Sequence, residues 1–184
     1  MSGDAPKPML SFRRALGADV DAIVALAQSA YRGEASRTGW TTEADFLDGQ
    51  RVDADGVAAM LDHGQCILLA HADTDTDAAL VGCCHVAHDG DSCWFGLFAV
   101  PPERQGQGIG DALLARAEHE AVRAFAATGM RMKVIWLRDS LISWYERRGY
   151  ALTAERAPFP YGDSRFGVPL RGDLHFVVLD KVLR

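Results

Sequence analysis

The sequence predicts an α/β fold with a mixed, mostly antiparallel central sheet. Apolar runs of strand length recur along the chain, and segments of helical periodicity separate several of them. One strand, helix and strand in succession form a parallel β-α-β unit, because a long connection between two strands favours parallel pairing. The 184 residues are 48% hydrophobic and 24% charged. We therefore expect one domain over residues 1–184, with residues 1–8 as a flexible tail.

About the first third of the chain is predicted to hold one strand and two helices. The strand covers Met9–Arg14. Asp19–Tyr31 follows with apolar residues at helical spacing, and an aspartate in its first turn could cap it. A second helix is expected over Asp55–Asp62 and ends at Gly64, where a glycine can take the left-handed conformation of a helix C-terminus.

Three antiparallel strands come next. They cover Gln65–Ala72, Ala79–His88 and Cys93–Val100. An acidic segment, Asp73–Asp77, joins the first two, and Asp89-Gly90 is a hairpin signal between the second and the third. These strands are expected to form the antiparallel half of the sheet.

The parallel unit begins where the third strand ends. Pro101-Pro102 stops it, since proline cannot donate to a ladder. A helix over Gly108–Thr128 carries an apolar residue at every fourth position, and a strand over Arg131–Leu137 completes the unit.

The C-terminal part is predicted to add one helix and two strands. The short helix runs from a Ser140 cap through Arg148 and ends at Gly149. The strands cover Tyr150–Glu155 and Leu174–Val182, separated by the Pro/Gly-rich loop 158–172.

A glycine-rich loop, Gln105-Gly106-Gln107-Gly108-Ile109-Gly110, precedes the long helix. With few β-carbons in the way, its N–H groups can approach a ligand at the positive end of the helix dipole. A Walker loop requires Gly-Lys-Ser/Thr, which is absent here, and the glycine spacing does not fit a dinucleotide fingerprint. The loop instead reads Gln105-x-x-Gly108-x-Gly110. Its accessible N–H groups at a helix N-terminus predict a pyrophosphate cradle.

Two motifs together resemble the GCN5-related N-acetyltransferase (GNAT) family. The first is the loop preceded by Val100-Pro-Pro-Glu-Arg, and the second is Trp144-Tyr145-Glu-Arg-Arg-Gly149-Tyr150. The resemblance implies the GNAT fold and acetyl-CoA as co-substrate. It implies that the pyrophosphate binds at Gln105, Gly106, Gln107, Gly108, Ile109 and Gly110, and that the pantetheine arm pairs with the backbone of Phe98, Ala99 and Val100, where two neighbouring strands splay apart.

The resemblance also assigns the chemistry. Tyr145 would lie near the sulfur and donate to the leaving thiolate as general acid, although an aromatic packing role stays open. The oxyanion would accept a backbone N–H near Phe98. Because the stretch 94–100 contains no Asp, Glu or His, the base stays open between Glu43, Glu34 and His85, acting directly or through water.

One position departs from the family pattern. Arg138 stands where family members often have Asn, so that it could reach a phosphate or pair with Asp139 in solvent. Substrate contacts are expected from the segment after the first helix and from the late loop, at Tyr31, Trp40, Thr41, Glu43, Tyr161 and Arg165. Trp40 beside Glu43 would suit an ammonium group. The alternative is a buried Trp40, with Glu43 in a capping box at a helix that starts from Thr41 or Thr42.

Composition narrows the functional class. No apolar run reaches the roughly 20 residues of a transmembrane helix and no signal segment is evident, so we expect a cytoplasmic protein. Cys66, Cys83, Cys84 and Cys93 lack zinc-site spacing, so no metal is expected and they should pack as small hydrophobes. A net charge of −6 argues against a nucleic-acid surface and is compatible with a cationic acceptor.

The function predicted from these observations is acetyl-CoA-dependent transfer of an acetyl group to a primary amine of a small molecule or protein. The alternative is a non-catalytic acyl-CoA-binding or sensor module of the same fold. Transfer to a hydroxyl, or use of a longer acyl group, is a third reading. The terminal strand Leu174–Val182 could also pair across the two-fold axis of a homodimer.

Overall fold

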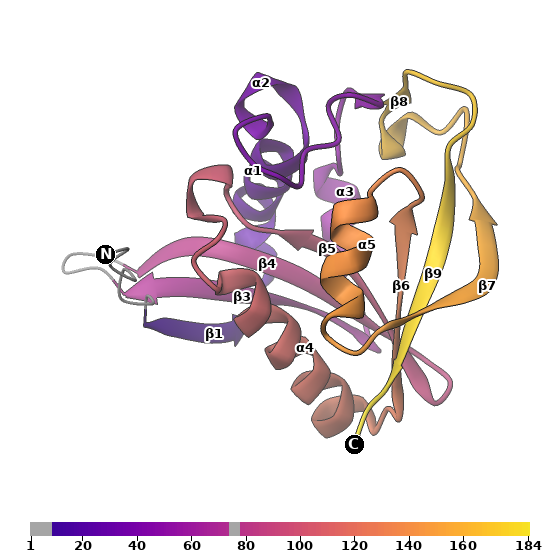
Figure 1. The fold of residues 1–184 in the computed structure, drawn as a ribbon. Coiled ribbons are helices and arrows are strands. Elements are labelled where there is room, and N and C mark those ends of the chain that lie inside the picture. The colour runs from indigo at the N-terminus through magenta and orange to yellow at the C-terminus, as the bar shows by residue number, and fades with distance from the viewer. Residues whose placement is uncertain (1–8, 74–77) are drawn as a thin grey trace, which may run out of the picture.

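A twisted seven-stranded sheet forms the centre of the protein (Figure 1). The computed structural model describes residues 9–73 and 78–184. The strand order is β1-β3-β4-β5-β6-β9-β7, and all neighbours are antiparallel except the parallel pair β5–β6. The strands are β1 Leu10–Arg14, β3 Gln65–Asp73, β4 Ala78–Asp89, β5 Ser92–Ala99, β6 Gly129–Ile135, β7 Ala151–Pro158 and β9 His175–Val182. The predicted fold class is confirmed.

The helices follow the predicted order, with small shifts at their ends. They are α1 Val20–Tyr31, α2 Gly33–Ser36, α3 Ala54–Ala59, α4 Ile109–Phe125 and α5 Asp139–Glu146, with 3-10 turns at Gly17–Asp19, Pro102–Arg104 and Ser164–Phe166. A second sheet pairs two short strands, β2 Leu47–Asp48 and β8 Val168–Pro169. The elements α2, β2 and β8 were not predicted from the sequence, because segments of two to four residues are too short to show a period.

Helices cover both faces of the sheet, and alternate strand residues face opposite ways. In β3, Cys66 and Leu68 join the core beneath α4 and α5, whereas Ile67 and Leu69 join the core with α1 and α3. Figure 1 shows α4 and α5 across the near face, with α1 behind the sheet. All four cysteines are buried and unpaired, which confirms that they pack as small hydrophobes.

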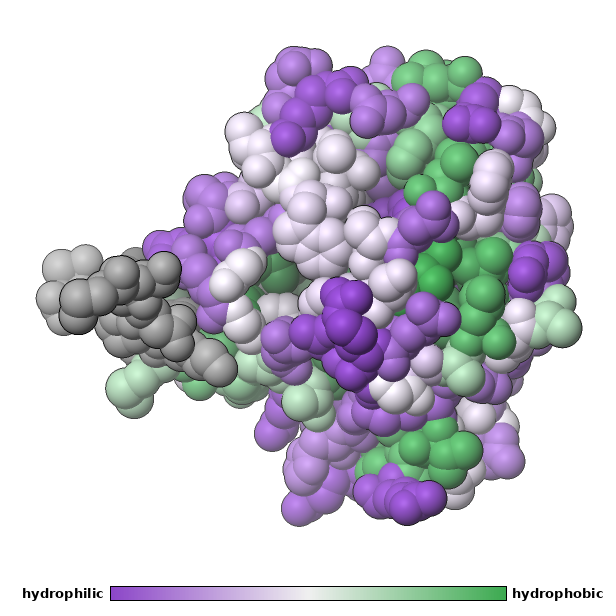
Figure 2. Space-filling model, in the orientation of Figure 1, coloured by the Kyte–Doolittle hydropathy of each residue, from purple (hydrophilic) through white to green (hydrophobic). Residues whose placement is uncertain are grey.

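The outer surface is mixed in polarity. Figure 2 shows hydrophilic residues over most of the near face, with apolar patches toward the side of β7 and β9 and near the C-terminal end. Leu152 on β7 and Val182 on β9 are among the exposed large hydrophobics. No helix in the described ranges is long and apolar enough to cross a membrane.

Two expectations about element ends and edges are wrong. Ser140 lies inside α5, whose N-cap residue is Arg138 and has no side-chain cap. β9 lies between β6 and β7, so both of its sides are paired, and the sheet ends at β1 and β7 instead. The terminal strand therefore has no free edge for dimer pairing. Gly149 does follow α5 with a φ of 88°, as predicted for a helix end.

Close packing of α4 on β4 fixes the position of the glycine-rich loop. Ile109 and Leu113 of α4 are almost fully buried. Beneath them lies Gly82 of β4, where a Cβ would stand 2.5 Å from Leu113 Cδ1 and 3.3 Å from the Ala99 carbonyl oxygen. The absence of a side chain at Gly82 thus allows the first turn of α4 to contact the sheet.

We expect Gly82→Ala to lower the free energy of unfolding by about 1–3 kcal/mol, because the added methyl overpacks a closed core. Gly17→Ala is the matched control, since a Cβ there meets nothing within 4 Å. Urea unfolding measures both. Equal stability of the two variants would contradict the close packing described here.

Candidate active site

A bulge in β5 opens the sheet beside the glycine-rich loop. The parallel pairing of β5 with β6 runs from Ser92 to Phe95 and then ends. The bulge lies between the pairs His85↔Gly96 and Cys83↔Ala99, where β5 advances by three residues and β4 by only two. Within it, Leu97 takes a left-handed φ of 41°. Such a residue twists and bends its strand. β5 therefore stays on β4 while it separates from β6.

The loop after β5 forms a backbone cradle at the start of α4. Gly106 and Gly108 have φ values of 79° and 82°, a conformation that favours glycine. Gly108 is the N-cap of α4 and supplies no side-chain cap, so the first N–H groups of the helix lack that acceptor. These features fit a pyrophosphate at the positive end of a helix dipole.

A cavity of about 300 Å³ lies in front of this cradle. We call it the cofactor-side cavity. It is lined by Tyr31, Trp40, Thr41, Phe98, Val100, Arg104, Gln105, Gly106, Gly108, Gly110, Asp111, Leu141 and Trp144. It thus joins the loop, the end of β5 and the two tryptophans, whose ring centroids are 6.4 Å apart. Trp40 is 46% exposed, so the expectation of a buried Trp40 is wrong.

The Gln105 side chain ties the wall of this cavity together. Its amide oxygen accepts from the backbone N–H of Trp40 at 3.0 Å. Its amide nitrogen donates to Thr41 Oγ1 at 2.9 Å and to the Val100 carbonyl at 3.1 Å. Gln105 therefore anchors the segment after α2 to the end of β5, which leaves its backbone for the cradle.

Tyr31 makes a second link to β5. Its hydroxyl donates to the Phe98 carbonyl, and its ring lies 5.2 Å from the Arg51 guanidinium and 5.4 Å from that of Arg138. The Phe98 and Val100 carbonyls thus both have side-chain partners. A pantetheine arm on this segment has to share or displace these bonds.

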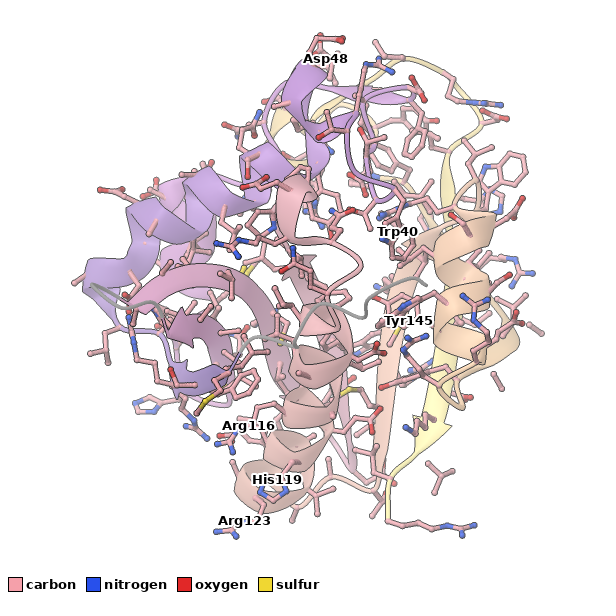
Figure 3. All side chains as sticks on the ribbon, turned by 60° about the vertical axis from the view of Figure 1, so that its left-hand side comes forward. Trp40, Asp48, Arg116, His119, Arg123 and Tyr145 are labelled. Atoms are coloured by element: carbon pink, nitrogen blue, oxygen red, sulfur yellow. The ribbon has the colours of Figure 1, made fainter. Side chains whose placement is uncertain are left out.

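Tyr145 of α5 lies in the cleft between β5 and β6. Figure 3 shows Tyr145 on α5 below Trp40, both on the side where α5 faces the segment after α2. The Tyr145 ring packs against Phe95, Phe98 and Tyr150. The Tyr145 hydroxyl makes no hydrogen bond to any residue that the structure describes. Burial raises the pKa of this hydroxyl well above its usual value, so it stays protonated at neutral pH.

Glu43 is buried in a cluster of arginines. Its oxygens accept from Arg32 at 2.5 Å and from Arg138 at 2.9 Å, and Arg51 Nε lies 3.8 Å away. Although burial opposes it, the attraction of the arginines holds the pKa of Glu43 below its ordinary value. A carboxylate stabilised in this way is a weak base, which disfavours Glu43 as the group that takes the acceptor's proton.

This cluster overturns two structural alternatives from the sequence. No helix begins at Thr41 or Thr42, so Glu43 is not part of a capping box. The Arg138 side chain is 10% exposed and binds Glu43 and the Thr41 carbonyl. It therefore does not pair with Asp139 in solvent, and it lines the cleft that holds Tyr145 rather than the cavity at the glycine-rich loop.

The remaining candidates lie in different surroundings. The Glu34 side chain is 91% exposed and pairs with Arg37. His85 Nε2 is 2.9 Å from Gln65 Oε1, and burial lowers the pKa of His85 to about 4.

The two substrate candidates of the late loop bind neighbouring residues of that loop. The Tyr161 hydroxyl bonds to the backbone of Arg171 and Leu174, and Arg165 pairs with Asp163. Tyr161 and Arg165 line neither the cofactor-side cavity nor the cavity described next.

A second cavity of about 310 Å³ lies toward β6 and the late loop. We call it the acceptor-side cavity. It is lined by Arg32, Glu43, Leu47, Arg51, His85, Trp94, Phe95, Gly96, Lys133, Ile135, Phe159, Phe166 and Phe176. The narrow cleft that holds Tyr145 shares several of these residues. Sequence reasoning missed Arg51 and Lys133, since no motif marks them and only strand register and loop packing place them together.

Comparison with known proteins identifies the central part of the chain. The GNAT acetyltransferase domain model matches residues 63–152, which run from β3 to the start of β7 and include the loop, α4 and Tyr145. This part of the chain belongs to the GNAT acetyltransferase family. A search of curated proteins finds no matching sequence.

Solved structures share the GNAT fold. The ribosomal-protein-S18-alanine N-acetyltransferase from Escherichia coli has a TM-score of 0.67 at 15% identity, with 95% of this chain and 94% of that chain covered. Nourseothricin acetyltransferase has a TM-score of 0.65 at 20% identity, with 95% of this chain and 99% of that chain covered. The yncA protein from Salmonella typhimurium, solved with its cofactor acetyl-CoA, has a TM-score of 0.66 at 22% identity, with 96% of this chain and 95% of that chain covered. At these identities, the likeness establishes the fold.

We expect Glu43→Gln to lower the free energy of unfolding by about 3–5 kcal/mol, because it leaves the buried Arg32 without its counter-ion. Since the folded pKa of Glu43 lies below its unfolded value, the stabilisation is full at neutral pH and declines as the pH falls through the folded pKa. The stability gap between the two proteins should therefore narrow in acid. Urea titrations at several pH values measure this gap.

Glu155→Gln is the matched control. Glu155 pairs with Arg131 on the surface and its side chain is 49% exposed, so this loss should cost about 0–1 kcal/mol. Similar costs for the two variants would show that the Glu43 cluster is not a structural centre.

Proposed function

We propose that this protein transfers the acetyl group of acetyl-CoA to a primary amine, with Tyr145 as the proton donor. The observation that carries the proposal is the divergence of β5 from β6 beside a glycine-rich helix N-terminus and a buried tyrosine hydroxyl that has no hydrogen-bond partner in the described part of the chain. Acetyl-CoA supplies the activated acyl thioester. The family uses this co-substrate, which supports the assignment.

Different residues of this chain would bind the co-substrate, stabilise the oxyanion and donate the proton. Backbone groups of Gln105, Gly106, Gln107, Gly108, Ile109 and Gly110 hold the pyrophosphate, and those of Phe98, Ala99 and Val100 hold the pantetheine arm as an added strand would. Backbone N–H groups of the separated part of β5 stabilise the oxyanion. The Tyr145 hydroxyl, which burial keeps protonated, donates to the departing thiolate.

Deprotonation of the amine is assigned to water or to the amine's own equilibrium with solvent. Glu43 is neutralised by arginines, Glu34 is outside the cavities, and His85 is neutral at pH 7 but weakly basic. A non-catalytic acyl-CoA-binding module is the second candidate, and the same lack of a strong base favours it. It predicts acetyl-CoA binding with no thiol release in the presence of any amine.

For Tyr145→Phe, we expect turnover to fall by about 10- to 100-fold with an unchanged acetyl-CoA dissociation constant, because only the proton donor is lost. Tyr150→Phe is the control, since it removes another buried hydroxyl, one that binds Glu118 at 2.9 Å and lines neither cavity. Thiol release and calorimetry separate turnover from binding. Unchanged turnover in Tyr145→Phe would remove Tyr145 from the chemistry.

Gly106→Val should weaken acetyl-CoA binding by at least about tenfold, because the side chain enters the cradle and hinders the pyrophosphate. Gly90→Val is matched in backbone strain, since Gly90 has a φ of 64° and lies at the β4–β5 hairpin. It should bind acetyl-CoA normally. If both variants kept wild-type affinity in a calorimetric titration, the loop would not be the pyrophosphate site.

A further inference from the structure

The acceptor-side cavity and the adjoining cleft carry an excess of positive charge. Arg32, Arg51, Arg138 and Lys133 line one or both of them, against a single carboxylate, that of Glu43. His85 adds no charge at neutral pH, since burial lowers its pKa to about 4. Glu43 is already bound by Arg32 and Arg138. Arg51 and Lys133 therefore keep most of their charge for a ligand.

Both of these cations have unused hydrogen-bond donors. Arg51 Nε is buried and has no hydrogen-bond partner among the residues that the structure describes. The Glu43 oxygen with which it pairs is 3.8 Å away. Within residues 9–73 and 78–184, Lys133 makes no ion pair, and its ammonium group lies 4.9 Å over the Trp94 ring. A buried donor without a partner is costly, and a carboxylate oxygen would satisfy it.

The rest of the cavity wall is apolar. Phe159 is buried, and Phe166 and Phe176 contribute further aromatic surface. Such a wall suits an apolar side chain next to the carboxylate. A polyamine, by contrast, would be repelled by the arginines and the lysine.

The cavity leads toward the proposed chemistry. Arg51, Lys133, Phe95 and Gly96 line both the cavity and the cleft that holds Tyr145. A carboxylate bound at Arg51 and Lys133 therefore lies beside the point where β5 and β6 separate. An amine a few bonds from that carboxylate would reach the separated part of β5.

We propose that the acceptor is an amine that also carries a carboxylate and an apolar side chain, as an apolar amino acid does, with Arg51 and Lys133 as the carboxylate site. This inference deepens the proposed function and rests on it. It differs from the expectation of a cationic acceptor from the net charge of −6, because the local charge of the cavity, rather than the total charge, acts on the ligand.

Binding can be measured without turnover. Calorimetric titrations of the full chain, in the presence of CoA, would compare leucine, methionine and phenylalanine with their carboxamides, which keep the amine and the side chain but lack the charge. We expect each acid to bind at least about tenfold more tightly than its amide, as the loss of a charge-assisted hydrogen bond implies.

Lys133→Gln removes one half of the carboxylate site at a solvent-exposed position and should bring the affinities of acid and amide together. Arg131→Gln is the control, since it removes the same charge two residues away on β6. Arg131 also lies over the Trp94 ring but pairs with Glu155 and lines neither cavity. It should keep the preference for the acid.

The outcomes separate the two proposals. Tight binding of the acids without thiol release from acetyl-CoA would support the carboxylate site and contradict the proposed acetyl transfer. Thiol release with amides equal to or better than the acids would support acetyl transfer and overturn the carboxylate site. The site is also overturned if none of the three acids binds more tightly than its amide, or if Arg131→Gln removes the preference as fully as Lys133→Gln does.

Discussion

The separation of β5 from β6 after Phe95 is the constraint on which the rest of the site depends. It results from one extra residue, Leu97, which adopts a left-handed backbone that costs a non-glycine residue about 1–3 kcal/mol. Packing offsets this cost, because Leu97 is buried in the core beneath α1 and α3. Without the bulge, continued pairing of the two strands would close the cleft in which Tyr145 lies.

Two cavities with different chemistry adjoin the cleft at this separation. The cofactor-side cavity is built from backbone and aromatic groups around a helix N-terminus, whereas the acceptor-side cavity is lined by cations and apolar rings. The buried Glu43 cluster joins them, since it connects the end of α1, the segment before β2 and the start of α5 through Arg32 and Arg138. One carboxylate thus holds three segments around the site.

The sequence predicted the sheet, its parallel unit and the glycine-rich loop, because each depends on local periodicity or on glycine and proline chemistry. It also singled out Tyr145 and Gln105 through motifs. It could not predict that Gln105 ties down Trp40 and Thr41, or that Arg138 pairs with a glutamate 95 residues away. The positive charge of the acceptor-side cavity could not be predicted for the same reason, since only tertiary packing places Arg51 and Lys133 in one cavity.

Amide hydrogen exchange with and without acetyl-CoA tests most directly whether the divergence of β5 from β6 is the cofactor site. We expect slower exchange at Phe98, Ala99 and Val100 and from Gly106 to Ala112 when acetyl-CoA is added, with no such change for ATP. The hairpin around Gly90 should be unaffected by either ligand. Saturable acetyl-CoA binding that leaves exchange at β5 and the loop unchanged, or that protects another part of the sheet, would contradict this assignment.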